Sequence, residues 1–395
     1  MLAVFNSTRK VWSRAAGALA LLALSACEPI DLAGLGGGGD SGPQIDPSAA
    51  IPVALLVPRG GGNPSDDLLA ASLENAARLA VSELQGARID LRVYGTAGNA
   101  ATATSAAQLA VAEGARIIVG PLYAEAANAV GVAVADQNVN VLAFSNNPTI
   151  AGGNVFILGP TFDNTANRLM GFAASQGRNK VVVVHSTDVS GQLGRNAIQQ
   201  AATRNGAQIV ASVDYQLSQD GVAAAVPRIK SAVDSSGANA VFMTSTPSGA
   251  LPLYASLLPE AGVRSETSQF IGLTRWDVPA QTLSLPGLQN GWFALPDQRS
   301  SAAFSSRYQA AYGSAPHPVG GLAFDGIAAV GALIAEGKRN ALTTSALTQN
   351  AGFQGVSGAF RLLPDGSNQR AVAVATVRGG QIAILDPAPQ SFGGF

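Results

Sequence analysis

The hydrophobic pattern becomes regular at Ile51 and alternates between two periods. Residues 51–57, IPVALLV, form a continuous apolar run that predicts a buried strand. In residues 66–85 the apolar side chains recur every three or four positions, which predicts an amphipathic helix. Repetition of this alternation predicts a β-α-β-α-β-α-β order and a parallel sheet covered by helices on both faces. The other predicted strands of this series are residues 87–95, 115–120 and 139–145.

A second series with the same plan begins at residue 180. The run KVVVVHS, residues 180–186, predicts a strand, and residues 191–206 predict a helix closed by Gly206. Residues 220–237 predict a helical segment that Pro227 interrupts. Two series with one plan predict two similar α/β lobes. Further strands of the second series are predicted at residues 207–215, 238–246, 269–276 and 288–296.

The C-terminal part changes pattern. Two helices are predicted at residues 301–312 and 321–337, and alternating runs follow from residue 353. The turn sequences Pro364-Asp365-Gly366 and Arg378-Gly379-Gly380 interrupt these runs and predict β-hairpins. We therefore expect the chain to return to the two lobes in separate pieces.

Composition narrows the functional class. The 395 residues are 47% hydrophobic and 12% charged, with a net charge of -1, which fits two compact domains with sizeable cores. Because the few Lys and Arg are scattered, no basic face is available to neutralise phosphates. Nucleic acid is therefore a poor partner for this chain.

The N-terminus carries the pattern of a secretory signal. Arg9, Lys10 and Arg14 precede an apolar run, residues 15–24, that is too short to span a bilayer as a mature helix. The sequence Leu-Ser-Ala-Cys that ends at Cys27 resembles a bacterial lipobox, whose cysteine is acylated. The alternative is an ordinary exported protein with a stray cysteine. With the lipobox interpretation, residues 1–27 are a signal peptide together with its lipobox, cleaved on the amino side of Cys27. The mature chain is then anchored by lipid to a bacterial membrane, on its periplasmic face.

Residues 28–50 are rich in Gly, Pro, Ser and Asp and predict a flexible tether. Gly34, Gly36 and Gly39 formally match a dinucleotide-binding motif. No strand is predicted before them and no helix after them, so the match is compositional.

The sequence contains none of the common catalytic motifs that we sought. It contains neither a G-x-S-x-G elbow nor a phosphate-binding G-x-x-x-x-G-K-[ST] loop, and its one cysteine is the predicted lipid site. His185 and His317 have no second ligand at metal spacing, and His185 is either a ligand contact or a satisfied strand-end residue. Asp66 and Asp67 lie at a predicted helix start, where capping and dipole roles explain them. We predict a protein that is not an enzyme, with neither metal nor cofactor.

Several phrases, in order, resemble the type I periplasmic binding proteins of the leucine-binding protein family. They are IIVGP (117–121) with the following helix, VLAFS (141–145), NVFILGPTFDN (154–164) before VVVVHS (181–186), FSSRYQAAYGSAP (304–316) before AFDGIAAVGAL (323–333), and FQGVSGAFRLLPDGSNQRAVAVATVRGG (353–380). The resemblance covers about residues 51–386. It implies an α/β fold of two doubly wound parallel-sheet lobes joined by three crossovers, with a ligand between the lobes at the carboxyl ends of the strands.

The resemblance implies crossovers near Gly159, Leu295 and Phe353. The first lobe then comprises residues 51–159 and 296–352, and the second lobe comprises residues 160–295 and 353–386. Residues 387–395 form a tail.

Amino-acid-binding members of this family hold the ligand with hydroxyls of the first lobe and with a tyrosine and an acid of the second. In this sequence the serine position falls on Ala124, the tyrosine position on Ser190, and the acidic position near Thr274. With no carboxylate to pair with a ligand ammonium, we do not expect tight binding of free leucine. The polar loop after VLAF supplies the remaining candidates of the first lobe, Ser145, Asn146 and Asn147.

Aromatic and basic side chains complete the predicted ligand site. The resemblance places Tyr123 and Trp276 on loops facing the ligand, one from each lobe, where they either stack on it or pack internally. Trp292 and Phe293 lie beside a crossover, where we expect core packing. Arg59, in the Gly-rich loop after the first strand, either meets an anionic ligand or stays solvated.

Two functions from different classes fit this resemblance. The phrases VLAFSNN (141–147), GGNVFILGPTFDN (152–164) and NGWFALPD (290–297) look most like lipoproteins of this fold described as penicillin-binding-protein activators, whose partner is a peptidoglycan synthase. The alternative is a receptor that delivers an amino acid or amide to an ABC permease.

Overall fold

The computed structural model describes residues 41–392, and its first lobe is built on a five-stranded sheet. The strands follow the order β2-β1-β3-β4-β5, and every neighbouring pair is parallel. This confirms the predicted strand and helix order of the first series. The elements are β1 (Ile51–Val57), α2 (Pro64–Glu83), β2 (Ile89–Gly95), α3 (Ala100–Ala112), β3 (Ile117–Val119), α4 (Ala124–Val134), β4 (Asn140–Ala143) and β5 (Val155–Ile157).

The side chains of β1 point alternately to the two faces of this sheet, and both faces are buried. Val53, Leu55 and Val57 point into the core formed with α2, whereas Ala54 and Leu56 point into the core formed with α3 and α4. Because successive side chains of a strand point to opposite faces, the continuous apolar run of β1 needs helices on both sides. Alanines on α3 and α4 let these helices pack closely on the second face.

The second lobe has a seven-stranded sheet in the order β15-β14-β10-β9-β8-β6-β7. The strands β6 to β10 are parallel to their neighbours, and the hairpin β14–β15 joins them antiparallel to β10. In β6, Val182 and Val184 face α7 and α8, and Val181 and Val183 face α5 and α6. The elements are α5 (Phe162–Ser175), β6 (Lys180–Ser186), α6 (Val189–Arg204), β7 (Gln208–Tyr215), α7 (Gln219–Ser236), β8 (Ala240–Met243), α8 (Leu251–Glu260), β9 (Gln269–Gly272), β10 (Trp292–Leu295), β14 (Ala373–Arg378) and β15 (Gln381–Asp386).

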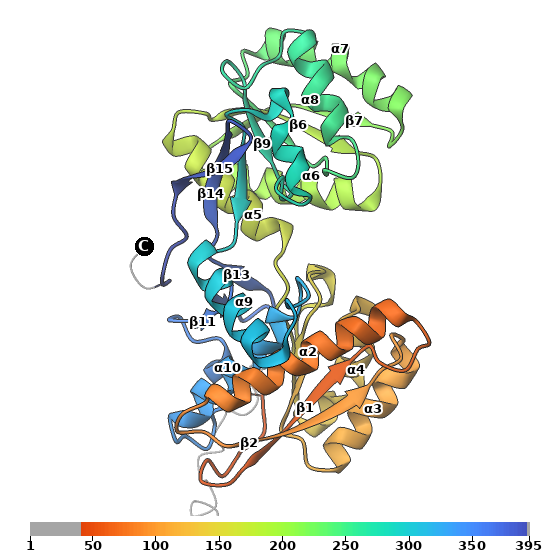
Figure 1. Cartoon of the computed structure of the whole chain (residues 1–395), viewed down its shortest axis with the longest axis vertical. Helices are drawn as coiled ribbons and strands as arrows, with labels where there is room; N and C mark the ends of the chain where they lie inside the picture. Colours follow the sequence, from red (N-terminus) through yellow and green to blue (C-terminus); the bar gives the residue numbers. More distant parts are fainter. Residues whose placement is uncertain (1–40, 393–395) are drawn as a thin grey trace, which may run out of the picture. The chain divides into compact units, whose positions relative to one another are not determined.

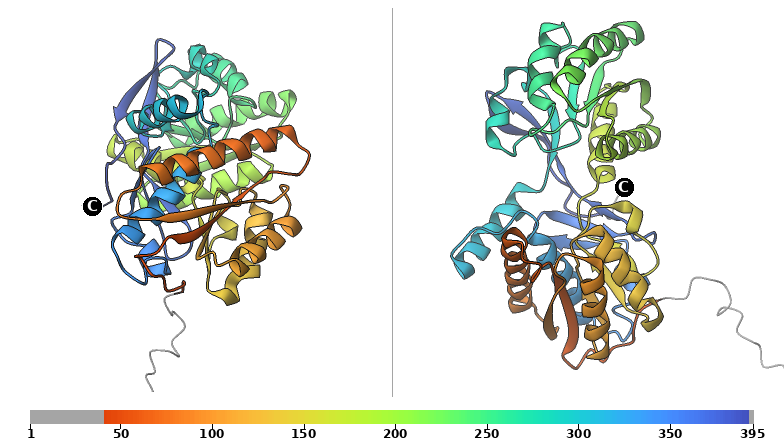
Figure 2. Two further views of the ribbon diagram at one scale, coloured as in Figure 1. Left: turned by 60° about the horizontal axis from the view of Figure 1, so that its bottom comes forward. Right: turned by 90° about the vertical axis from the view of Figure 1, so that its right-hand side faces the viewer.

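Segments distant in sequence complete each lobe. Helices α9 (Gln298–Tyr312) and α10 (Gly321–Ala335) lie beside α2 of the first lobe, as Figure 1 shows. In Figure 2 the C-terminal hairpin, in dark blue, lies with the green and cyan elements of the second lobe. The predicted turns at 364–366 and 378–380 both connect antiparallel strands, which confirms them as hairpin turns. The short helix α11 is Thr344–Leu347.

The predicted third crossover near Phe353 is wrong. Strands β11 (Phe353–Gly355), β12 (Gly358–Leu362) and β13 (Asn368–Arg370) form a separate three-stranded sheet. Phe353, Phe360 and Leu362 are buried in the first-lobe core, and the second sheet receives the chain only at β14. The sequence showed alternating strands in this region but not which core their apolar faces enter.

A buried polar network ties the crossovers together. Asn368 donates from Nδ2 to the carbonyls of Ile157 and Gly159 at 2.7 and 2.9 Å and accepts from Asn164 at 2.7 Å. Arg370 donates from Nη1 to the fully buried Asp325 at 2.9 Å and from Nε to the carbonyl of Leu158 at 2.7 Å. These bonds attach β13, the strand before the third crossover, to the segment that forms the first crossover.

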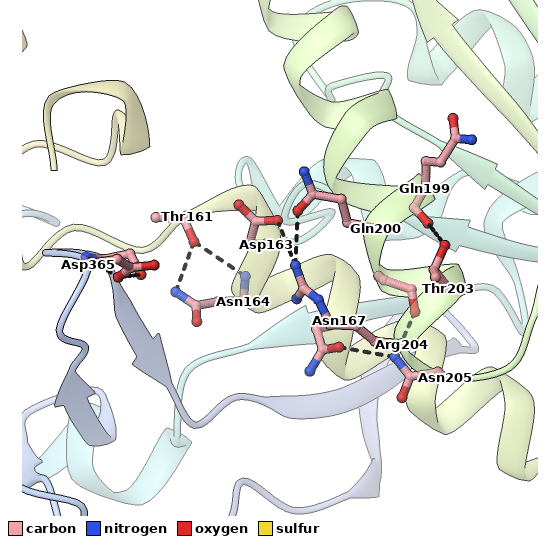
Figure 3. A network of polar contacts seen from close by, with 12 residues as sticks. Thr161, Asp163, Asn164, Asn167, Gln199, Gln200, Thr203, Arg204, Asn205 and Asp365 are labelled. Atoms are coloured by element: carbon pink, nitrogen blue, oxygen red, sulfur yellow. Dashed lines mark hydrogen bonds and ion pairs between the residues drawn. The ribbon is translucent and has the colours of Figure 1, made fainter. Parts of the chain in front are cut away.

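The start of α5 carries a second polar network. The Thr161 hydroxyl caps this helix by accepting from the Asn164 backbone N–H, and it also accepts from the Asn164 side chain (Figure 3). At the end of α6, Asn205 donates to Asn167 at 3.0 Å and Arg204 approaches Asp163 at 3.8 Å. These contacts hold α5 and α6 together at the entry to the second lobe.

Two local predictions need correction. Within the predicted tether of residues 28–50, the described part from Ser41 is bound to the first lobe: Ile45 is buried in its core and bonds through its N–H to the Arg339 carbonyl at 2.8 Å. Helix α7 runs through Pro227 without interruption. Proline has no N–H to donate to the carbonyl of Ala223, four residues earlier. Both residues are exposed to solvent. The predicted signal peptide, Cys27 and the 34–39 glycine motif lie outside the described residues.

Candidate functional site

At the carboxyl edge of the first sheet, β3 leads through a tight turn into α4. A Cβ on Gly120 would lie 2.3 Å from the carbonyl oxygen of Leu56, and Gly120 has a φ of +94°, so only glycine fits there. Helix α4 begins at Ala124, and no side chain caps its first turn. The predicted corner is therefore present, and Ala124 contributes no hydroxyl to it.

Tyr123 lies in this turn and is engaged with the first turn of α2. Its hydroxyl donates to Asp66 Oδ1 at 2.5 Å, and a Cβ on Gly98 would lie 3.3 Å from its ring. The side chain remains 39% exposed. The hydrogen bond to the Asp66 carboxylate, aided by partial burial and by the charge of Asp66, raises the pKa of Tyr123. Tyr123 thus presents an exposed ring, while Asp66 fixes its hydroxyl.

Arg59 is held by an ion pair on the same edge. Its Nη2 lies 2.7 Å from Glu74 Oε2, and Glu74 also pairs with Arg78. Burial opposes ionisation of Glu74, but the hydrogen bonds from the two arginines outweigh it and lower the pKa of the carboxyl. An anionic ligand would have to compete with Glu74 for this guanidinium.

The loop after β4 brings three predicted polar residues together. Ser145 is buried, and its Oγ accepts from the Asn147 N–H at 3.1 Å. Asn147 caps the next short helix by accepting from Thr149 at 3.0 Å. Asn146 is exposed, and its side chain forms no hydrogen bond within the described residues. The side chain of Asn146 is therefore the available hydrogen-bonding group of this loop.

In the second lobe, the end of β6 and the start of α6 form the corresponding edge. Asp188 caps α6 by accepting from the Gly191 N–H at 2.7 Å, and Ser186 donates to the same carboxylate at 2.8 Å. Ser190, in the first turn, is exposed to solvent. His185 is buried, with Nδ1 3.0 Å from the Ser186 carbonyl oxygen, which fits a satisfied strand-end histidine.

The loop after β9 separates two predicted site residues. Thr274 is half-buried at the edge and donates to the Ser245 carbonyl at 3.0 Å. Trp276 is fully buried and stacks on Phe293, with ring centroids 5.6 Å apart. This packing is possible because Gly272 and Gly291 have no side chain, and a Cβ on either would overlap the indole. Of the two roles predicted for Trp276, the structure shows the packing role. Phe293 is also core, whereas Trp292 is half-buried against Phe172.

Sequence reasoning overlooked the hydroxyls that follow β8. Thr244 and Ser245 lie directly after this strand, and neither buried side-chain oxygen has a hydrogen-bond partner among the described residues. Leaving such a group unpaired costs roughly 1–3 kcal/mol, so both have capacity for another partner. The run TSTPS, residues 244–248, directly follows a predicted buried strand and could have indicated these polar groups.

The family model for the periplasmic binding proteins matches residues 50–381. The chain belongs to the periplasmic binding protein family. Its two wound lobes are those of the type I fold, which confirms the predicted fold class. Comparison with the curated proteins gave no match.

Solved structures of the same fold cover most of this binding protein. A protein described as a branched-chain amino acid ABC transporter, from Rhodospirillum rubrum, has 16% identity and a TM-score of 0.72, covering 85% of this chain and 100% of its own. A periplasmic ligand-binding protein of a branched-chain amino acid ABC transporter from Burkholderia xenovorans has 17% identity and a TM-score of 0.66, covering 87% and 97%. An ABC transporter substrate-binding protein from Desulfitobacterium hafniense in complex with Leu has 18% identity and a TM-score of 0.60, covering 85% and 100%.

Two further observations concern the described part of this binding protein. No helix there combines the length and apolarity needed to cross a membrane. Within residues 41–392, no group of three or more His, Cys, Asp or Glu side chains is placed to hold a metal ion.

Proposed function

We propose that the protein is a non-enzymatic periplasmic receptor that delivers a small polar solute, an amino acid or an amide, to an ABC permease. The observation that carries this proposal is the polar character of both carboxyl edges in a chain of this family. Asn146 on the first edge is exposed, and Thr244 and Ser245 on the second edge carry buried hydroxyls; none of the three side chains has a hydrogen-bond partner among the described residues. Anchoring through acylated Cys27 and a site that also includes Arg59, Tyr123, Ser190 and Thr274 are part of the same proposal.

The charges of the second edge favour an amide over free leucine as the ligand. Thr274 stands where amino-acid-binding members place an acid, and the nearby Asp277 is paired with Arg275 through a 2.9 Å hydrogen bond. A ligand ammonium would therefore find no free carboxylate in this loop, and burying an unpaired charge costs several kcal/mol. A ligand whose nitrogen is acylated avoids this cost.

A thermal-shift screen with free amino acids and their N-acetyl derivatives, in which the nitrogen is acylated to an amide, tests the receptor function. Binding to the native state at one hundred times Kd stabilises it by about 2.7 kcal/mol and raises Tm, and we expect the N-acetyl derivatives to raise it more than free leucine. Asn146→Ala and Ser245→Ala should each reduce the shift, whereas Arg116→Gln, which changes an exposed arginine elsewhere in the first lobe, should not. A flat response across the panel would contradict solute transport.

The second candidate is activation of a penicillin-binding protein, with a peptidoglycan synthase as partner. It is favoured by the pairing of charged and polar groups with one another on the first edge, Arg59 with Glu74 and Tyr123 with Asp66. Because these groups already have partners within the protein, such an edge suits a scaffold that does not bind and release a ligand. The test is capture of a bifunctional peptidoglycan synthase and a rise in its polymerisation rate, with Tyr123→Ala as the variant. Absence of binding to the synthase would eliminate this candidate.

A further inference from the structure

A pocket of about 360 Å³ lies in the second lobe, away from the loops described above. Gln269 and Trp292, the first residues of β9 and β10, line it together with residues of α5 and β14. It therefore sits at the amino ends of the parallel strands, whereas the candidate ligand loops follow their carboxyl ends. We call it the amino-end pocket.

One wall of the amino-end pocket is aromatic. Trp292 is half-buried and meets Phe172 edge to face, with ring centroids 4.9 Å apart and an interplanar angle of 70°. This contact fixes the indole while leaving part of it available in the pocket. A flat apolar surface of this kind suits a planar ring, because aromatic rings gain from stacked or edge contacts beyond the area they bury.

Two nearly buried polar side chains line the pocket and keep unused hydrogen-bonding capacity. Thr376 is 2% exposed, and its hydroxyl has no hydrogen-bond partner within residues 41–392. Gln269 is 5% exposed, and its amide nitrogen donates to the Asn290 carbonyl at 2.8 Å and to Ser265 Oγ at 3.1 Å. These bonds fix the carboxamide and leave its oxygen as an acceptor. A ligand with a hydrogen-bond donor would satisfy Gln269, and Thr376 can donate or accept.

The only charged side chain lining the pocket, among the described residues, is Arg378. It is exposed at the end of β14 and forms no ion pair within the described part of the chain. A free guanidinium without a neighbouring carboxylate in the lining selects for a negative charge, and its planar fork matches a carboxylate.

We propose that the amino-end pocket binds a small planar aromatic monoanion that also carries a hydrogen-bond donor. The ring lies against Trp292, the carboxylate pairs with Arg378, and the donor reaches Gln269 or Thr376. This site is separate from the proposed transport site and does not depend on it.

The test is titration of the full chain with 4-hydroxybenzoate, with neutral 4-hydroxybenzamide as the matched ligand control. The indole N–H signals, assigned by single Trp→Phe variants, report where the ligand sits. We expect saturable binding that moves the Trp292 signal and leaves that of buried Trp276 in place. The neutral amide should bind about tenfold more weakly, since its carbonyl oxygen replaces a charged carboxylate as the partner of Arg378.

Four variants separate this site from the edges of the sheets. Arg378→Gln should weaken binding about tenfold and Thr376→Val about threefold, whereas Arg116→Gln, an exposed arginine of the first lobe, should change nothing. Ser245→Ala should also leave this affinity unchanged, even if it abolishes binding of a transported solute. The proposal is overturned if the Trp292 signal does not saturate, if Arg378→Gln binds like the native chain, or if Ser245→Ala removes the binding.

Discussion

The Tyr123 hydroxyl and the Asp66 carboxylate join two positions 57 residues apart, at the edge where the first lobe meets a ligand in our proposal. The sequence allowed Tyr123 to stack or to pack, and it assigned Asp66 to the helix start. It could not show their contact, because that depends on how the loops after β1 and β3 approach each other across Gly98. Trp276 shows the same limit, since its position beside a loop gave no sign that Gly272 and Gly291 leave room to bury it.

The Tyr123 contact makes a prediction about ionisation. Because the hydrogen bond to Asp66 raises the pKa of Tyr123, Asp66→Asn should shift its ionisation to lower pH. The difference between spectrophotometric titrations of the native chain and the variant isolates this one tyrosine. Asp67→Asn is the matched control, because Asp67 accepts from the Gly60 N–H instead. Identical titration curves for Asp66→Asn and the native chain would rule out the contact.

At the scale of elements, strand and helix order was predictable because it depends on local period, and both parallel series appear as expected. The assignment of β11–β13 was not, because alternation marks an apolar face without naming the core that receives it. Helix α7 continues through Pro227, where we expected an interruption, because packing was not visible in the local pattern. Packing of Val222, Ile229 and Val233 holds the helix through Pro227, which sits on its solvent side.

Helix α9 carries a cap whose effect depends on pH. The Ser300 backbone N–H, which donates to Asp297 at 2.7 Å, lowers the pKa of this carboxyl, assisted by the Ser300 and Gln390 side chains. A lowered carboxyl pKa stabilises the fold above the unfolded value of about 4, and this stabilisation is lost as pH falls through the folded pKa.

Asp297→Ala should therefore cost about 1 kcal/mol of unfolding free energy at pH 7, and the deficit should shrink below about pH 4. Urea denaturation over this pH range measures both values. Glu266→Ala, which changes an exposed carboxylate outside any helix, should cost little at either pH. A deficit that grows on acidification would contradict the assigned sign.

At the scale of the whole molecule, the family resemblance anticipated two lobes and three crossovers, while the third crossover proved to lie after β13. Its position follows from a buried pair that no local pattern reveals, Asp325 with Arg370, which are 45 residues apart. Arg370 also stacks on Phe360, 4.8 Å from the ring centroid. The pair anchors β13 to the first lobe just before the chain leaves for the second.

Breaking this pair should be costly. Asp325→Ala leaves the Arg370 charge buried and should lower the unfolding free energy by about 3–5 kcal/mol, whereas adding Arg370→Met should recover part of the loss. The exposed pair of Lys338 with Glu336 is the control, and Lys338→Met should cost no more than about 1 kcal/mol. Strictly additive losses in the double variant would show that Asp325 and Arg370 do not act as a pair.

In our proposal, a solute bridges the two carboxyl edges. The most direct measurement is calorimetric titration of the best ligand from the thermal-shift screen into the native chain, Asn146→Ala, Ser245→Ala and the control Thr376→Val. We expect one site per chain, with affinity reduced by both edge variants and unchanged by Thr376→Val. Equal affinity in both edge variants and the native chain would contradict it.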